Sequence, residues 1–316
     1  MKLSNSIKKR FCKDFSLPIG LFDDEAFYYF IELYDVQYNT KAKLKLLEDI
    51  ITELGSEEAF MQEFNLLKNR IIEDISATPT YTKLAADKNP YPYEAKHQYS
   101  GQNIYIPEFA GRKFISIDLC KANFLALKTY DATVDCAKYD KMLDGAESWD
   151  GYLSANNDLE YYHKSKQLRQ VIFGNLLPKR QQSIQKSMCK EIADTIKAMD
   201  STLELAIVST DEILILNHPD PFIGVLDVSN KLRSVLGYTD NEIRVEAFEL
   251  EQIHPEKSYF IKKDLFSSDI TFKSIPQLFF AQVFKHYFGK PMNDTDKTFF
   301  HEGCTAIFTE SIYEGQ

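Results

Sequence analysis

The chain has 316 residues, of which 44% are hydrophobic, and a formal net charge of −10. A chain of this length and composition can bury a substantial core in one large or two modest domains, which excludes an intrinsically disordered protein. No apolar run approaches the roughly 20 residues that cross a bilayer, and the opening stretch MKLSNSIKKRFCKDF lacks the apolar core of a signal peptide. We therefore expect a protein without membrane association that stays in the cytoplasm or another intracellular compartment.

Several common site types are excluded by spacing. The five cysteines include no Cys-x-x-Cys pair, and the six histidines show no His-x-His or His-x-x-x-His spacing. Reduced thiols and structural or surface histidines are therefore expected. The chain also lacks the phosphate-cradling patterns GxxxxGK[ST] and GxGxxG.

Apolar residues in the first part of the chain follow helical spacing. Through residues 23–75 they recur every three or four positions, with breaks at Asn39-Thr40 and Gly55-Ser56, which predicts three helices. The two acids that follow Ser56 suit a helix start, where the helix dipole is positive. The prolines of NPYPY, residues 89–93, indicate a linker after this helical region.

From residue 103 the spacing becomes that of strands. NIYIPEFAGRKFISIDL predicts two strands, LELAIVSTDEILIL two more, and IRVEAFELEQIHPEKSYFIKK a further pair that turns at His254-Pro255. Helical patterns occupy residues 121–130, 163–200 with a break at 174–178, and 276–289. Hairpins interleaved with long helices predict an α+β fold with an antiparallel sheet.

Basic residues gather in one segment of this acidic chain. Residues 161–190 contain no acid and seven cations, namely Lys164, Lys166, Arg169, Lys179, Arg180, Lys186 and Lys190. Such a segment can attract a polyanion to one place. A solvated helix face explains the same pattern, so charge alone leaves both interpretations open.

Carboxylates stand at two strand ends. Asp118 ends one predicted strand, and Asp211 lies in the turn between two others, so pairing of these strands would bring both to one edge of the sheet. Hard oxygen ligands suit Mg²⁺, and two such ions support an in-line phosphoryl transfer. Solvated turn residues are the simpler interpretation of Asp211 and Glu212, and spacing alone favours it.

Four segments, in the right order, resemble the palm of family B DNA polymerases. ISIDLCKANFLAL is similar to the first motif, KQLRQVIFG to the second, Ser209-Thr210-Asp211-Glu212 to the third, and Lys257-Ser258-Tyr259 to the Lys-x-Tyr element of that family. The likeness covers roughly residues 103–265. It implies a palm-like antiparallel sheet with packed helices.

The resemblance also implies a role for each matched residue. Asp118 and Asp211, with Glu212 beside them, would hold Mg²⁺ or Mn²⁺. Lys166 would neutralise the incoming nucleoside triphosphate, with Lys164 or Arg169 assisting.

The other matched residues would contact the substrate or the duplex. Phe173 and Gly174 would let the nascent base pair approach the backbone closely. Lys257 and Tyr259 would contact the nucleic-acid backbone near the growing end, and the cations Lys179 and Arg180 lie where nucleic acid would pass.

The sequence departs from the family pattern at several places. Ser209 replaces the first acid of the third motif, and Asn123 stands where the family has a tyrosine that stacks under the sugar, which implies relaxed sugar selectivity. Asp118 and Lys166 are close in sequence, so the fingers would be short. DLCKA and the adjacent acids Asp211-Glu212 also resemble reverse transcriptases, but the second motif and the Lys-x-Tyr element fit that family less well.

We therefore expect an N-terminal helical region at 1–88, a polymerase-like palm with short fingers at 103–265, and a C-terminal helical, thumb-like region at 266–316. The leading hypothesis is a divergent nucleic-acid polymerase or nucleotidyltransferase that uses two metal ions and lacks an exonuclease. The alternative is a catalytically inactive palm that binds nucleic acid or protein in a viral replication or transcription complex. The N-terminal helices offer a surface for such a protein partner.

Overall fold

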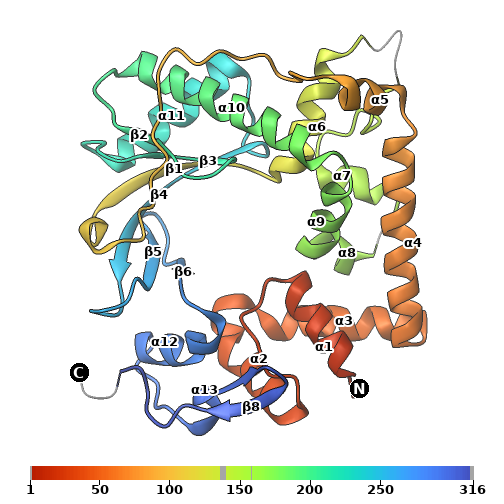
Figure 1. Cartoon of the computed structure of the whole chain (residues 1–316), viewed down its shortest axis with the longest axis vertical. Coiled ribbons are helices and arrows are strands. Elements are labelled where there is room, and N and C mark those ends of the chain that lie inside the picture. Colours follow the sequence, from red (N-terminus) through yellow and green to blue (C-terminus); the bar gives the residue numbers. More distant parts are fainter. Residues whose placement is uncertain (1, 136–139, 158, 314–316) are drawn as a thin grey trace. The chain divides into compact units, whose positions relative to one another are not determined.

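The computed structural model describes residues 2–135, 140–157 and 159–313 (Figure 1). The chain forms two compact units, which we call the helical unit (Met1–Arg70, Leu153–Ile172 and Ile275–Gln316) and the sheet unit (Ile71–Tyr152 and Phe173–Ser274). Each unit therefore combines segments that are distant in the sequence. Cys12, Cys120, Cys189 and Cys304 are free thiols, and Cys136 lies outside the described residues.

Helices dominate the helical unit. Its elements are α1 (Asn5–Asp14), α2 (Asp24–Tyr38), α3 (Thr40–Leu54), α4 (Glu57–Ser76), α8 (Glu160–Lys164), α9 (Lys166–Gly174), the 3₁₀ turn η2 (Gln277–Phe279), α12 (Phe280–Tyr287), α13 (Asp294–Lys297) and the hairpin of β7 (Thr298–His301) and β8 (Cys304–Ile307). The last residues of α4 and α9 belong to the sheet unit. The C-terminal segment, expected to be helical, thus also contains strands.

The three helices predicted across residues 23–75 are confirmed as α2, α3 and α4, and α1 precedes them. The predicted breaks occur because the chain turns at Asn39 and Gly55, which both adopt left-handed backbone with φ of 49° and 89°. A left-handed residue ends a helix, and glycine adopts this conformation without steric cost.

A buried carboxylate joins segments of the helical unit that are far apart in sequence. The side chain of Asp14 is fully buried and accepts hydrogen bonds from Arg10 Nε at 2.9 and 3.0 Å. It also accepts hydrogen bonds from Tyr161 and Ser165, each at 2.7 Å. These donors attach the segment 153–172 to α1. Because the charge has several donors, its burial is tolerated.

The sheet unit contains a six-stranded antiparallel sheet, as predicted. Its strands are β1 (Lys113–Leu119), β2 (Leu205–Ile207), β3 (Glu212–Ile215), β4 (Ile243–Gln252), β5 (Phe260–Asp264) and β6 (Ile270–Lys273), in the spatial order β2-β3-β1-β4-β5-β6. Its helices are α5 (Pro79–Ala86), α6 (Ala122–Thr133), α7 (Trp149–Ser154, whose last residues belong to the helical unit), α10 (Pro178–Met199) and α11 (Pro221–Leu236). Strand β6 and the helices α7 and α11 are additions to the predicted elements.

The central part of the sheet has a split βαβ topology. Strand β1 leads through helices to the β2–β3 hairpin, and α11 then leads to β4, while the spatial order is β2-β3-β1-β4. This is the order of ferredoxin-like sheets, in which the first and third strands are central. The two strands that carry Asp118 and Glu212, β1 and β3, are therefore the central pair of this four-stranded part of the sheet.

One expected strand is absent from this sheet. Residues 103–106 form no strand, and Pro107–Phe109 form the 3₁₀ turn η1. Pro107 has no N–H to donate to a strand ladder, and the neighbouring side chains of Ile104 and Phe109 are buried in an apolar cluster against β1 and β4 instead. The prediction of a strand before Gly111 is therefore wrong.

The two faces of the sheet differ. Helices α10 and α11 pack on the face that carries Ile115, Ile117 and Ile213, all fully buried or nearly so (Figure 1). The contact with α11 is tight, because a Cβ on Gly224 would lie 2.4 Å from Ile115 Cδ1. The opposite face carries the apolar cluster at one end and charged side chains at the other.

Residues 91–99 pack along α10 through tyrosines, and we call this segment the strap. Tyr91 donates to Glu191 at 2.5 Å, and Tyr93 and Tyr99 donate to Asp194 at 2.8 and 2.5 Å. Asp194 also accepts from the backbone N–H of Lys96 and bonds His97 Nδ1, and its side chain is 2% exposed. Burial opposes its ionisation, but the donors together lower the pKa of Asp194 to about 2. The linker expected at 89–93 is thus fastened to a helix.

Candidate functional site

The end of β1 and the β2–β3 turn lie together at one edge of the sheet. Asp118 pairs directly with Glu212, and the N–H of Leu119 donates to the carbonyl oxygen of Asp211 at 2.9 Å. The expected pairing of these strands is therefore present. The residue opposite Asp118 on β3 is Glu212, whereas Asp211 belongs to the turn.

An open pocket of about 310 Å³ lies on the sheet face opposite α10 and α11. It is lined by Ser116, Asp118, Glu212, Arg244, Glu246, Phe248, Lys262, Asp264, Asp269, Thr271 and Lys273. The register explains this set, because residues that pair across an antiparallel sheet point to the same face. Asp118 pairs with Arg244 on its other side, and Ser116 pairs with Glu246.

Asp118 lies in an excess of negative charge. Burial raises its pKa to about 6, and the nearby carboxylates of Asp211, Glu212 and Glu246 add to the rise while Arg244 opposes it. Arg244 reaches Asp118 Oδ2 at 3.1 Å, but its side chain is 59% exposed and it also contacts Glu246 at 3.2 Å. An exposed pair of this kind contributes only about 0–1 kcal/mol. The guanidinium therefore compensates Asp118 weakly.

The negative charge of Glu212 has closer partners than that of Asp118. Its Oε1 accepts from Lys262 Nζ at 2.9 Å and from Ser116 Oγ at 2.8 Å. Burial opposes ionisation, but attraction to Lys262 and these two hydrogen bonds hold the pKa of Glu212 below its ordinary value. Lys262 is 11% exposed, and its ammonium lies 4.3 Å from the centroid of the Phe248 ring.

A second lysine faces the same pocket. Lys273 of β6 has no ion-pair partner within 4 Å among the residues that the structure describes. Burial and repulsion from Lys262 lower its pKa, while Glu212, Glu246 and Asp118 oppose this change. The pocket thus presents cations and carboxylates side by side.

The turn residues are held locally. Ser209 Oγ donates to Asp211 Oδ1 at 2.5 Å, so the serine that replaces an acid of the third motif bonds the remaining acid. Cys189 of α10 donates to the carbonyl oxygen of Thr210 at 3.4 Å. Burial raises the pKa of Cys189 to about 12, with Asp211 and Asp118 adding to the rise, so this thiol stays protonated.

Several other predicted residues belong to the sheet unit. Asn123 on α6 accepts a hydrogen bond from Gln185 of α10 at 2.8 Å, which fixes its amide. Lys179 is exposed at the start of α10, and Arg180 bonds the carbonyl oxygen of Ala85 at 3.3 Å. The expected contacts of these residues with a nucleotide or a nucleic acid stay predictions.

Two aromatic residues are less accessible than expected. Phe173 is fully buried, with its ring centroid 5.5 Å from that of Trp149. Tyr259 is 7% exposed and packs on His254, while Lys257 beside it is half-buried. Because burial occupies the Phe173 ring in the core, contact of this ring with a base pair is not supported. At Gly174 an added Cβ would meet no atom within 4 Å, so packing does not require glycine.

The cations Lys164, Lys166 and Arg169 belong to the helical unit. Lys164 pairs with Glu160 at 2.5 Å, and Lys166 is exposed at the first position of α9. Their expected role against a triphosphate stays a prediction, since Asp118 belongs to the sheet unit.

Sequence reasoning missed Arg244, Glu246, Lys262 and Lys273. A signal existed for the first two, because charged residues alternate with apolar ones in IRVEAFELEQ, which places them on one face of a strand. No such signal existed for Lys262, because Lys263 follows it directly in the sequence. Only the pairing register of β5 with β4 shows which of the two lysines points to the pocket face.

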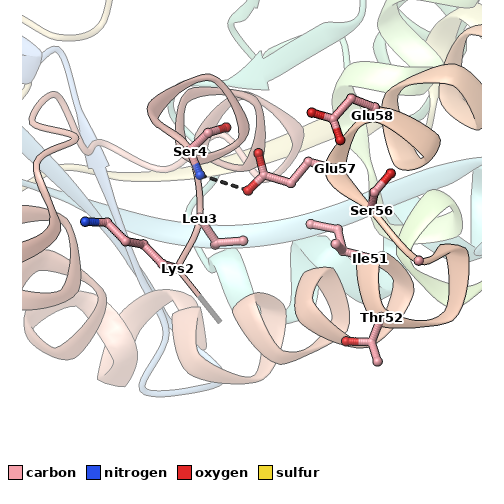
Figure 2. A pocket seen from close by; sticks show the side chains of 9 residues that line it. Lys2, Leu3, Ser4, Ile51, Thr52, Ser56, Glu57 and Glu58 are labelled. Carbon is pink, nitrogen blue, oxygen red and sulfur yellow. Dashed lines mark hydrogen bonds between the residues drawn. The ribbon is translucent and has the colours of Figure 1, made fainter.

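A second pocket, of about 660 Å³, lies in the helical unit where α1 and α4 begin (Figure 2). Glu57 accepts from the N–H of Ser4 at 2.8 Å, and Ser56 Oγ accepts from the N–H of Ala59 at 3.0 Å. One backbone N–H at each helix start is thus bonded by a side chain of the protein itself, as in helix capping. Capping therefore explains the positions of Glu57 and Ser56 in this pocket.

No family model, curated protein or solved structure matches this chain. Within residues 2–135, 140–157 and 159–313, no three or more His, Cys, Asp or Glu side chains are grouped to hold a metal ion. None of the helices in these ranges combines the length and apolar character needed to cross a membrane. The site must therefore be interpreted from its own geometry.

Proposed function

We propose that the sheet unit is a nucleotidyltransferase of the polymerase type, which extends a nucleic acid from nucleoside triphosphates. The observation that carries this proposal is the pairing of Asp118 with Glu212 on the two central strands of a split βαβ unit, where burial, with the neighbouring carboxylates adding to it, raises the pKa of Asp118 to about 6. A crowded, partly buried carboxylate is stabilised by a cation, because the cation offsets the repulsion from its neighbours. The family B resemblance of the segments around both acids supports the same chemistry.

The donor set suits Mg²⁺ or Mn²⁺. These ions prefer carboxylate oxygens, and one or two carboxylates with water and substrate phosphates commonly hold Mg²⁺. Asp118 and Asp211 would hold the ion, which when bound supplies a Lewis acid for the phosphoryl group. Lys273 and the exposed guanidinium of Arg244 would then contact phosphate oxygens from the same face of the sheet.

A second candidate function is an inactive palm that binds nucleic acid. The specific observation that favours it is the engagement of both carboxylates by cations, since Arg244 contacts Asp118 and Lys262 contacts Glu212. Such a module would bind phosphates through its lysines and arginines without transferring a nucleotide.

Nucleotide incorporation separates the two functions. The full chain is incubated with labelled nucleotides, Mg²⁺ or Mn²⁺, and primed or unprimed strands, beside the variants Asp118→Asn and Asp211→Asn. Asp227→Asn serves as the matched control, because Asp227 is an exposed residue of α11 outside the pocket. We expect incorporation by the wild type and D227N, and a loss of at least 100-fold in D118N and D211N, in line with other cases where a group that stabilises transition-state charge is removed.

Incorporation that D118N and D211N retain would place the chemistry elsewhere. If no form incorporates a nucleotide, the binding function takes precedence. In that case the affinity for a labelled strand should fall with salt, and neutralising Lys179 and Arg180 should reduce the salt slope by roughly 2, one for each lost phosphate contact.

A further inference from the structure

We infer that Lys262 is a built-in cation of the proposed site, which occupies beside Glu212 the place of one of the two divalent ions. The site then takes a single divalent ion, on the Asp118 side. This inference rests on the proposed function, because it specifies how many ions that site holds.

The contacts of Glu212 carry the inference. Lys262 Nζ and Ser116 Oγ both donate to the same oxygen, Oε1, at 2.9 and 2.8 Å. The Lys262 and Glu212 side chains are 11% and 20% exposed, so a hydrated ion approaching this oxygen would meet a partly desolvated, already bonded pair. Breaking such a pair leaves a charge with lost hydration and no partner, which is unfavourable.

The stem of Lys262 is also fixed. Its ammonium lies 4.3 Å from the centroid of Phe248, and Phe248 is 2% exposed in the core of the sheet. A cation over an aromatic ring is attracted to it, more so where water is partly excluded. Lys262 is therefore positioned by packing as well as by charge.

Asp118 differs in each of these respects. Its partner Arg244 is 59% exposed, shares its guanidinium with Glu246, and contacts Asp118 Oδ2 at 3.1 Å. A long exposed side chain can rotate into solvent at little cost. One carboxylate of the pair is thus accessible to an ion, and the other is already neutralised by the protein.

The charge of the pocket also favours a single divalent ion. Five carboxylates and three cations line it, and the neighbouring carboxylate of Asp211 brings the formal charge to −3. One divalent ion reduces this charge to −1. A second ion would make the pocket positive before any phosphate enters.

Counting bound Mn²⁺ tests the inference without any turnover. The full chain is titrated with Mn²⁺, and free Mn²⁺ is followed by electron paramagnetic resonance for the wild type, Lys262→Met, Lys262→Arg and Lys263→Met. Methionine keeps the apolar stem on Phe248 and removes the charge. Lys263 is the matched control, because it follows Lys262 on β5, pairs with Glu251 and lies on the opposite face of the sheet.

We expect one bound Mn²⁺ in the wild type, K262R and K263M, and two in K262M. Two ions in the wild type, or a single ion in both the wild type and K262M, would overturn the role of Lys262 and leave the proposed function intact. No bound Mn²⁺ in the wild type would instead overturn the proposed function itself. Thermal melting verifies that each variant is folded, and Lys262→Gln replaces K262M if that variant melts below the assay temperature.

Discussion

Buried charge is treated differently in the two units. In the helical unit, Asp14 has a fully buried side chain and receives hydrogen bonds from Arg10, Tyr161 and Ser165. In the sheet unit, Asp118 is 30% exposed, lines a pocket and has one weakly held cation among three neighbouring carboxylates. A fully bonded charge stabilises a fold, whereas an under-compensated charge in a pocket points to a ligand. This difference is the reason why we propose a function for the sheet unit.

The largest expected effect is the loss of the Asp14 network. Asp14→Ala removes the acceptor of Arg10, Tyr161 and Ser165, and we expect it to lower the free energy of unfolding by about 3–5 kcal/mol, as for other broken buried pairs. Urea unfolding of the full chain measures the change. Asp49→Ala, which removes an exposed pair with Lys45, is the control and should cost less than about 1 kcal/mol. Equal effects of the two substitutions would mean that the buried Asp14 network stabilises the helical unit no more than an exposed ion pair does.

Asp118→Asn should change the free energy of unfolding in the opposite direction. The pKa of Asp118 is about 6 in the folded protein and 3.8 ordinarily, so the folded state loses stability as pH rises from about 4 through 6. The substitution removes this loss, and we expect it to raise the free energy of unfolding at pH 8 by up to about 3 kcal/mol, since each pKa unit corresponds to roughly 1.4 kcal/mol. The gain should shrink at pH 4.5.

The neighbouring carboxylate offers a direct comparison. The pKa of Glu212 is lowered, so Glu212 stabilises the fold above its ordinary pKa and loses this contribution as pH falls. Glu212→Gln should therefore lower the free energy of unfolding at pH 8, whereas D118N should raise it. If both substitutions change the free energy of unfolding at pH 8 in the same direction, the two acids are not compensated differently.

Asp194→Asn should have a smaller effect within the sheet unit. The pKa of Asp194 is about 2 in the folded protein against 3.8 ordinarily, so its stabilisation is complete above pH 4 and lost as pH falls toward 2. We expect D194N to lose about 2 kcal/mol at pH 7. Thermal melting measures this loss, and limited proteolysis should show cleavage in the strap, residues 91–99. An unchanged cleavage pattern would mean that the tyrosines hold the strap without Asp194.

Much of the secondary structure could be predicted from local pattern. The helices of residues 23–75, strand β1, the β2–β3 hairpin and the β4–β5 pair all follow from apolar spacing and turn residues, because a periodic apolar face must be buried whatever covers it. The approach of Asp118 to the hairpin turn follows as well. The predicted strand at residues 103–106 is absent, because its apolar residues are buried in a core cluster without pairing to another strand. Apolar alternation in the sequence does not distinguish a paired strand from an unpaired buried segment.

The sequence by itself determined the α+β class and the two acid-bearing strand ends, since these depend on residues a few positions apart. Only the tertiary structure decided that Glu212, rather than Asp211, faces Asp118, and that Phe173 lies in the core. It also decided that Lys262 reaches Glu212 although two strands separate β5 from β3. These contacts join residues far apart in the chain, and a one-residue change of register would move each side chain to the other face.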